Sequence, residues 1–202
     1  MKKRLLPVAL LAWALTPAVE AQLESAYYGV SLGEFDYSTR AAGLSGKFNG
    51  SASSWRAMMG FQLTEHFALE GGYGETGTIR DTASASPPST AELGFETELH
   101  RIVTIRGLGT LPFDNGLSLM GGIGFFTFKQ EVALSLNGAP FLSADVSPDG
   151  FGNFAFYLGA QYDWDRVALR LSYEKWDFDS GAVLVFVGSD AQEVALSFFY
   201  KL

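Results

Sequence analysis

Apolar and polar residues alternate along most of the chain. In the last stretch, EVALSFFYKL, every second position is apolar or aromatic: Val194, Leu196, Phe198, Tyr200 and Leu202. Successive side chains of a β-strand point to opposite faces, so a period of two predicts a strand with one apolar face. The alternation recurs and predicts eight strands, at residues 26–38, 53–63, 67–79, 93–111, 117–136, 153–164, 167–178 and 190–202. No apolar stripe of helical period is long enough for a helix, so the expected fold class is all-β.

The connections between these strands alternate between short and long. Three are tight turns, TEH at 64–66, PFDN at 112–115 and DWDR at 163–166. The other four, at 39–53, 80–92, 137–151 and 179–190, are longer and rich in Gly, Ser, Asn and Pro, as loops are. The short connections therefore share one end of an up-and-down sheet, which is typical of outer-membrane barrels with short periplasmic turns.

The two faces of the strands differ in character. Along 53–63, one face carries Trp55, Ala57, Met59, Phe61 and Leu63, while Arg56 and Gln62 lie on the other. A soluble barrel such as a lipocalin would place the apolar face inside. Several charges instead lie in the middle of strands, opposite the aromatic row, which favours apolar side chains in lipid and polar ones in the lumen.

Burial in lipid also demands closure of the sheet. Hydrocarbon offers no partner for a free backbone N–H or C=O group, so an open edge is excluded and the first strand must pair with the last. The expected fold is a closed, eight-stranded, antiparallel, up-and-down transmembrane β-barrel. EVALSFFYKL is then the closing strand.

Composition and the N-terminus agree with export. Lys2, Lys3 and Arg4 precede an apolar stretch from 5 to 19 and a small-residue cleavage site, which predicts a signal peptide at 1–21 and a barrel domain at 22–202. Removal of 1–21 changes the formal net charge from -8 to -10, because three basic residues and Glu20 are lost. So acidic a chain is a poor nucleic-acid binder. It has no cysteine, so packing and hydrogen bonds alone must hold it together.

Three stretches resemble the outer membrane protein A-type eight-stranded β-barrel superfamily. YYGVSLGEF resembles its first strand, VALRLSYEKWDFD its seventh, and LSFFYKL the terminal signal read by the barrel assembly machinery. The resemblance implies the bacterial outer membrane as location, the assembly machinery as a partner, and Phe198, Tyr200 and Leu202 as the assembly signal. Outer-membrane lipid and lipopolysaccharide are further expected partners.

A set of charged residues is expected to face the lumen: Arg56, Glu70, Glu98, His100, Arg106, Arg170, Glu174 and Glu193. The interior of an eight-stranded barrel is only wide enough to be filled by side chains, so buried charges there must pair. One interpretation is a self-satisfied polar plug, and the alternative is a gated, low-conductance ion path with an Arg–Glu latch. The interior width favours the plug.

The sequence offers few residues that could form a catalytic, metal or phosphate site. A lipid-modifying hydrolase would need a histidine beside a serine, but the chain has only His66 and His100, with Ala68 and Ile102 where a His-x-Ser pattern would place serine. DFDSG at 177–181 lacks the later ligands of a calcium loop, and GLSGKF at 43–48 has Phe48 in place of the Ser or Thr of a phosphate loop. No cofactor, metal or catalytic residue is therefore predicted.

The connection at 179–190 contains an apolar run, VLVFV at 183–187. It either extends the last two strands as a packed hairpin or forms a contact patch for a host surface or another envelope protein, through Val185 and Phe186. The chain as a whole is predicted to be a non-enzymatic barrel with a structural or surface-interaction role. A narrow porin-like channel is the first alternative, and a lipid A or phospholipid acyl-modifying enzyme is the second.

Overall fold

The computed structural model describes residues 26–40, 47–84, 92–146, 153–177 and 190–202, and these residues form ten β-strands. The strands are β1 (Ala26–Arg40), β2 (Lys47–Thr64), β3 (Phe67–Thr76), β4 (Ile79–Ser84), β5 (Glu92–Pro112), β6 (Leu117–Leu136), β7 (Ala139–Val146), β8 (Asn153–Trp164), β9 (Val167–Asp177) and β10 (Asp190–Lys201). In this part of the chain no helix is long and apolar enough to cross a membrane.

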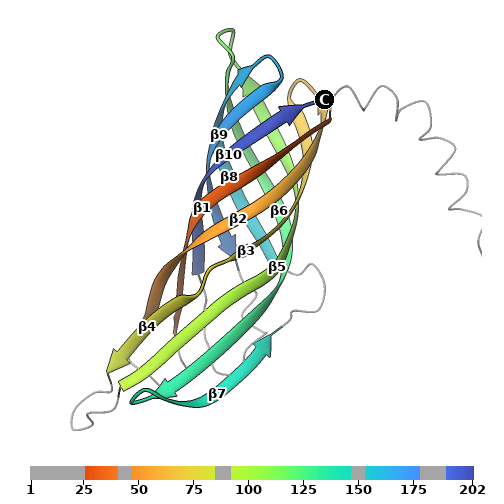
Figure 1. Ribbon diagram of the computed structural model, residues 1–202. Helices are drawn as coiled ribbons and strands as arrows, with labels where there is room; N and C mark the ends of the chain where they lie inside the picture. The colour runs from red at the N-terminus through yellow and green to blue at the C-terminus, as the bar shows by residue number, and fades with distance from the viewer. Residues whose placement is uncertain (1–25, 41–46, 85–91, 147–152, 178–189) are drawn as a thin grey trace, which may run out of the picture.

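Eight of the strands close into an antiparallel ring in the order β1, β2, β3, β5, β6, β8, β9, β10 (Figure 1). The predicted eight-stranded barrel is therefore confirmed. The short turns and the C-terminus lie at one end of the ring, called the turn end below, and the opposite end is called the loop end. At the loop end β5 and β6 continue beyond the ring, flanked by β4 and β7, and this four-stranded sheet is called the extension.

The ring is closed by β1 and β10. They pair over twelve residues, from Tyr27 opposite Lys201 to Ser38 opposite Asp190. Inside this seam the Ser197 hydroxyl donates a 2.9 Å hydrogen bond to that of Ser31, and Leu202 donates its N–H to Ala26. EVALSFFYKL is the closing strand, as its alternation and the exclusion of open edges predicted.

Three segments predicted to be loops contain strand. β2 begins at Lys47 rather than 53, β4 occupies 79–84, and β7 occupies 139–146. The β6–β7 hairpin turns at Asn137 and Gly138, both with positive φ. Two successive residues of this kind make the turn whose twist matches that of the flanking strands, and Asn-Gly is its preferred sequence.

Around the middle and the turn end, the outer wall of the barrel is apolar. Large exposed side chains include Val30, Leu32, Met59, Leu69, Ile105, Ile123, Phe125, Leu158, Leu171, Leu196 and Phe198. Aromatic pairs lie at its borders, Tyr28 with Tyr200 and Tyr162 with Trp164 near the turn end, and Trp55 with Tyr73 toward the loop end. An apolar band with an aromatic girdle at each border suits a lipid bilayer, and the predicted outward direction of the apolar row is confirmed here.

Beyond this band the sidedness of the barrel is inverted. On β1 the outward row changes from Val30 and Leu32 to Glu34, while the inward row changes from Ser31 to the fully buried Phe35. On β9 the outward row changes from Tyr173 to Lys175, and the inward row from Glu174 to Trp176. The loop end is therefore built like a water-soluble barrel, with a polar wall and an apolar core. The alternation predicts a polar lumen along the whole barrel, and this prediction is wrong at the loop end.

A β-bulge in β5 turns two of the residues predicted to face the lumen, Glu98 and His100, to the outer wall. Arg101 and Ile102 together face the single residue Phe128, and Arg101 has a φ of 50°. The extra residue exchanges the two faces of β5, so that Thr97 and Leu99 point inward before the bulge and Thr104 and Arg106 after it. Glu98 and His100, predicted to share the inward face with Arg106, therefore lie on the outer wall and are partly exposed.

The closing register can be tested by a disulfide. Ser31 and Ser197 are register partners with touching hydroxyls, so Ser31→Cys/Ser197→Cys should oxidise within the folded barrel. The native chain has no cysteine to compete. We expect a bridged product on non-reducing gels for this pair and none for Ser31→Cys/Ala195→Cys, whose partner is displaced by two residues. The same yield from both pairs would contradict the register.

Candidate functional site

The interior of the barrel gathers six charged side chains at the level of the outer apolar band. They come from five strands: Arg56 on β2, Glu70 on β3, Arg106 on β5, Arg170 and Glu174 on β9, and Glu193 on β10. Each is at most 4% exposed. Every one follows the inward parity of its strand, which turns all six toward the axis. Three arginines and three glutamates leave the group without formal net charge.

These residues form one alternating chain of ion pairs. Glu70 lies between Arg170 and Arg106, and Arg106 also contacts Glu174. Glu174 then contacts Arg56 at 2.6 Å, and Arg56 contacts Glu193. The order is thus Arg170, Glu70, Arg106, Glu174, Arg56 and Glu193, called the ionic chain below. Because each inner member has a partner on both sides, its desolvation is offset by two opposite charges.

Each of the three guanidinium groups lies over the face of an aromatic ring. Arg106 lies 4.3 Å from the ring centroid of Tyr157, Arg170 lies 4.1 Å from that of Phe199, and Arg56 lies 5.4 Å from that of Trp176. The negative face of an aromatic ring attracts a cation, more strongly where water is excluded. Each arginine is therefore held both by carboxylates and by the face of an aromatic ring.

Toward the turn end the ionic chain continues as a polar path. Arg170 donates from Nε to Gln161 at 2.8 Å, and Gln161 donates to Asp163 at 2.9 Å. Asp163 then forms an ion pair with Lys201 at 2.7 Å, near the end of β10. A cavity of about 380 Å³ opens beside this path and is lined in part by Tyr27, Thr110 and Arg170. Polar side chains therefore extend from the turn-end mouth to Glu193.

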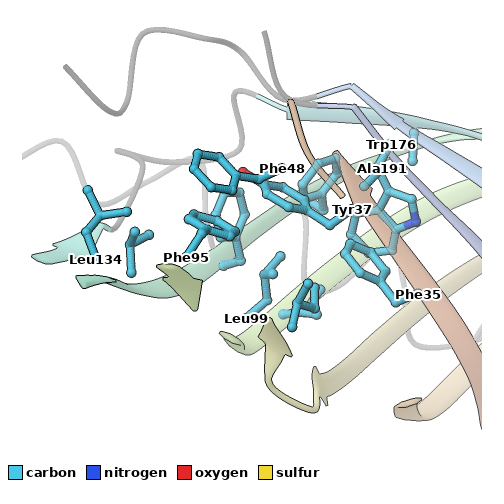
Figure 2. Close-up of a cluster of buried hydrophobic side chains, with 14 residues drawn as sticks. Phe35, Tyr37, Phe48, Phe95, Leu99, Leu134, Trp176 and Ala191 are labelled. Carbon is cyan, nitrogen blue, oxygen red and sulfur yellow. The ribbon is translucent and has the colours of Figure 1, made fainter. Parts of the chain in front are cut away.

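Toward the loop end the interior is closed by an apolar cluster. Its buried members, called the aromatic plug below, are Phe35, Tyr37, Phe48, Ile79, Phe95, Leu99, Ile102, Phe126, Phe128, Val132, Leu134, Ala155, Trp176 and Ala191. Figure 2 shows Phe35 beside Trp176, and Phe48 beside Phe95. The ring centroids of Phe126 and Trp176 are 4.5 Å apart. The plug lies above Arg56, because Trp176 contacts both that guanidinium and the ring of Phe35.

The structure also places the other predicted residues. Glu98 and His100 do not join the ionic chain, and His100 instead lies 3.6 Å from Glu98 and 3.8 Å from Glu131 on the outer wall. In the proposed assembly signal, Phe198 faces outward, Tyr200 contacts Tyr28, and Leu202 ends the chain at the turn end. Val185, Phe186 and the signal peptide at 1–21 lie outside the described residues.

Sequence reasoning missed the plug and the polar path. Trp176 carries a signal that could have revealed the plug, because it lies on the same parity as Arg170 and Glu174 of β9. Phe35 and Phe126 likewise share the parity of the buried polar residues Ser31 and Gln130 on their own strands. Gln161 and Asp163 share the inward parity of β8, but only the tertiary structure brings them to Arg170 and Lys201. Within the described residues no three His, Cys, Asp or Glu groups are arranged to hold a metal ion.

Removal of one inner member should strongly destabilise the barrel. Glu174→Gln leaves Arg56 and Arg106 each short of one anion in a dry interior, and we expect a loss of about 3–5 kcal/mol in unfolding free energy. Urea unfolding in lipid vesicles, followed by tryptophan fluorescence, measures it. Glu96→Gln, which breaks the exposed ion pair with Arg80, is the control and should change little. Equal stability of Glu174→Gln and the unmodified protein would contradict a stabilising role for the ionic chain.

Comparison with known proteins gives relatives by fold alone. No family model matches the chain, and no curated protein sequence matches it. Neisserial surface protein A superposes with a TM-score of 0.53 at 12% identity, covering 89% of this chain and 100% of that one. Ail, the attachment invasion locus protein of Yersinia pestis, gives 0.50 at 14% identity, covering 87% and 98%.

Each superposition covers nearly the whole of both chains compared, but the sequence identities are too low to transfer an activity. They agree with the ring of eight strands and with the apolar outer band, which requires a membrane around it. The chain therefore has the fold of small eight-stranded outer-membrane β-barrels such as these two.

Proposed function

We propose that the protein is a closed, non-enzymatic barrel that anchors a rigid extracellular platform for surface contact. The observation that carries the proposal is the filled interior, in which the ionic chain occupies the membrane level and the aromatic plug occupies the level above it. A transport protein needs an aqueous path through the whole barrel, and the cavity at the turn end is followed, among the described residues, by the ionic chain and then by the apolar plug. The same side chains brace the extension against the ring, since Ile79, Phe95 and Leu134 of the extension belong to the plug.

The platform combines a polar wall with local apolar exposure. Arg80 and Glu96 pair across the outer face of the extension at 3.0 Å, and this contact lowers the pKa of Glu96. On β7, Phe141 and Leu142 are 57% and 41% exposed. Exposed apolar side chains on a water-facing sheet favour contact with another surface. Together these features support a surface-interaction role.

A narrow channel is the second candidate, and the polar path favours it. Ions could approach from the turn-end mouth through the 380 Å³ cavity as far as Arg170. The obstacle is the plug, because an ion entering an apolar space loses its hydration without compensation. Conduction would therefore need movement of rings such as Phe35 and Trp176.

The histidines do not support a lipid-modifying enzyme. His66 lies in the turn between β2 and β3, where its ring contacts the carbonyl oxygen of Thr110 and the carboxylate of Glu65. The His100 ring lies 3.6 Å from the carboxylate of Glu98 and 3.8 Å from that of Glu131. Neither ring receives a hydroxyl proton within the described part of the chain, which a serine nucleophile would require.

Planar-bilayer recording separates a closed barrel from a channel. We expect no conductance above baseline for the unmodified protein, and a small ion current for Phe35→Ala/Trp176→Ala, which removes two neighbouring rings of the plug. Phe156→Ala, on the lipid face, is the matched control and should stay silent. Ion current through the unmodified protein would overturn the closed barrel. Silence of a folded double variant would show that the plug is not the limiting seal.

Surface contact through the platform is tested by cell adhesion. Phe141→Ser/Leu142→Ser removes the exposed apolar side chains of β7 without touching the ring, and we expect severalfold weaker binding of expressing cells to host cells or matrix. Asn49→Ser/Ser51→Ala, on exposed positions of β2, is the control and should bind normally. Equal adhesion of all three proteins at equal surface expression would contradict the role of β7.

A further inference from the structure

We propose that the outer wall of β5, β6 and β9 binds the phosphate groups of the lipopolysaccharide in the outer leaflet through Arg101, Lys129 and Lys175. This site goes beyond the platform proposed above, because it faces the membrane lipid and needs no external partner. All three side chains are exposed and directed away from the barrel interior. They are called the cationic row below.

The cationic row lies at the border of the apolar band. Going toward the loop end, the outward positions of β6 are Phe125, Thr127 and Lys129. Those of β9 are Leu171, Tyr173 and Lys175, so a tyrosine of the aromatic girdle immediately precedes the lysine. Lipid phosphates lie at this border, just outside the acyl chains. The cations are thus the first charges that a phosphate group meets on these strands.

Arg101 owes its place in the row to the bulge in β5. Without the extra residue, β5 would keep strict alternation, and no additional cation would point outward between His100 and Val103. The φ of 50° at Arg101 lies in the left-handed region, which is unfavourable for a non-glycine residue because its Cβ comes too close to the following carbonyl oxygen. Bulges occur where a side chain has to be re-aimed, and here the re-aimed side chain is a guanidinium.

The three cations have no ion partner in the described structure. Several other basic side chains do have one: Arg56, Arg106 and Arg170 in the interior, Arg80 in the extension, and Lys201 at the turn end. On each of these strands an acidic residue lies farther toward the loop end than the cation: Glu98 on β5, Glu131 on β6 and Asp177 on β9. Glu98 contacts His100. On each strand the cation is therefore nearer to the lipid than the acid.

The remaining wall of the barrel has the opposite character at this border. The first polar outward residues are Glu34 on β1, Ser53 on β2, Glu75 on β3 and Gln192 on β10. No cation stands among these four. Among the described residues, the outward cations at this border stand on β5, β6 and β9, which form one sector together with β8 between β6 and β9. A specific lipid site requires such a restriction, and a general attraction to an anionic membrane does not.

Below the cationic row lies an apolar surface suited to acyl chains. Ile105 pairs across strands with Phe125, Ile123 pairs with Phe156, and Phe156 in turn pairs with Lys175. The four apolar side chains are each about half exposed. A ligand with several phosphates above several closely packed chains fits this arrangement. Lipopolysaccharide has this chemistry, and its lipid A part carries two phosphates over a compact set of acyl chains.

The site can be tested with purified barrel in nanodiscs. Native mass spectrometry measures retention of bisphosphorylated lipid A, of its monophosphorylated form and of phosphatidylglycerol. We expect preferential retention of bisphosphorylated lipid A by the unmodified protein. Each cation near an anionic lipid surface contributes about fivefold in affinity, so Arg101→Gln/Lys129→Gln/Lys175→Gln should bind on the order of a hundredfold more weakly.

Lys47→Gln/Arg80→Gln is the matched control, since it removes exposed cations that lie farther from the apolar band. This control should retain lipid A normally. Equal retention by the triple variant and the unmodified protein would overturn the site. Equal retention of phosphatidylglycerol and lipid A would overturn lipopolysaccharide as its occupant. The proposed platform is tested separately by cell adhesion, because lipid retention does not measure surface contact.

Discussion

The structure depends on the requirement that every backbone group within the bilayer be paired inside the protein. This requirement forces β1 onto β10 and closes the ring. Closure at eight strands leaves an interior that side chains can fill. Charges turned into that interior must then find partners among themselves, and the alternating order from Arg170 to Glu193 provides them. The seam, the ionic chain and the closed lumen are therefore successive consequences of one constraint.

The second organising feature is the change of solvent along each strand. Within the bilayer the barrel is apolar outside and ionic inside, while beyond it Glu34 and Lys175 face water and Phe35 and Trp176 form a dry core. Both arrangements use the same strands, since alternation serves either solvent. The border between them is where Arg56 contacts Trp176 inside and where the cationic row lies outside. The junction of the ionic chain with the plug and the proposed lipid site therefore lie at the same level of the barrel, one inside and one outside its wall.

Local patterns predicted most of the fold, and their failures have physical causes. Alternation located the eight ring strands because each has one apolar face, and parity placed Arg56, Glu70 and Glu174 on the inward face. It failed at Glu98 and His100, because one extra residue at Arg101 exchanges the faces of β5 and leaves no mark in the alternation of apolar residues. Alternation also fails to predict the β6–β7 hairpin, because the polar composition of 137–151 indicates a loop, although Asn137-Gly138 is a strong turn signal.

The sequence by itself determined the strands, their faces, the short turns at one end and the need to close, because each follows from neighbouring residues and from the solvent around them. Only the tertiary structure decided which glutamate meets which arginine. Partners such as Glu70 and Arg170 are 100 residues apart, and their contact depends on the stagger of five strands around the ring. The aromatic plug arises in the same way, since Phe35, Phe126 and Trp176 meet only after closure.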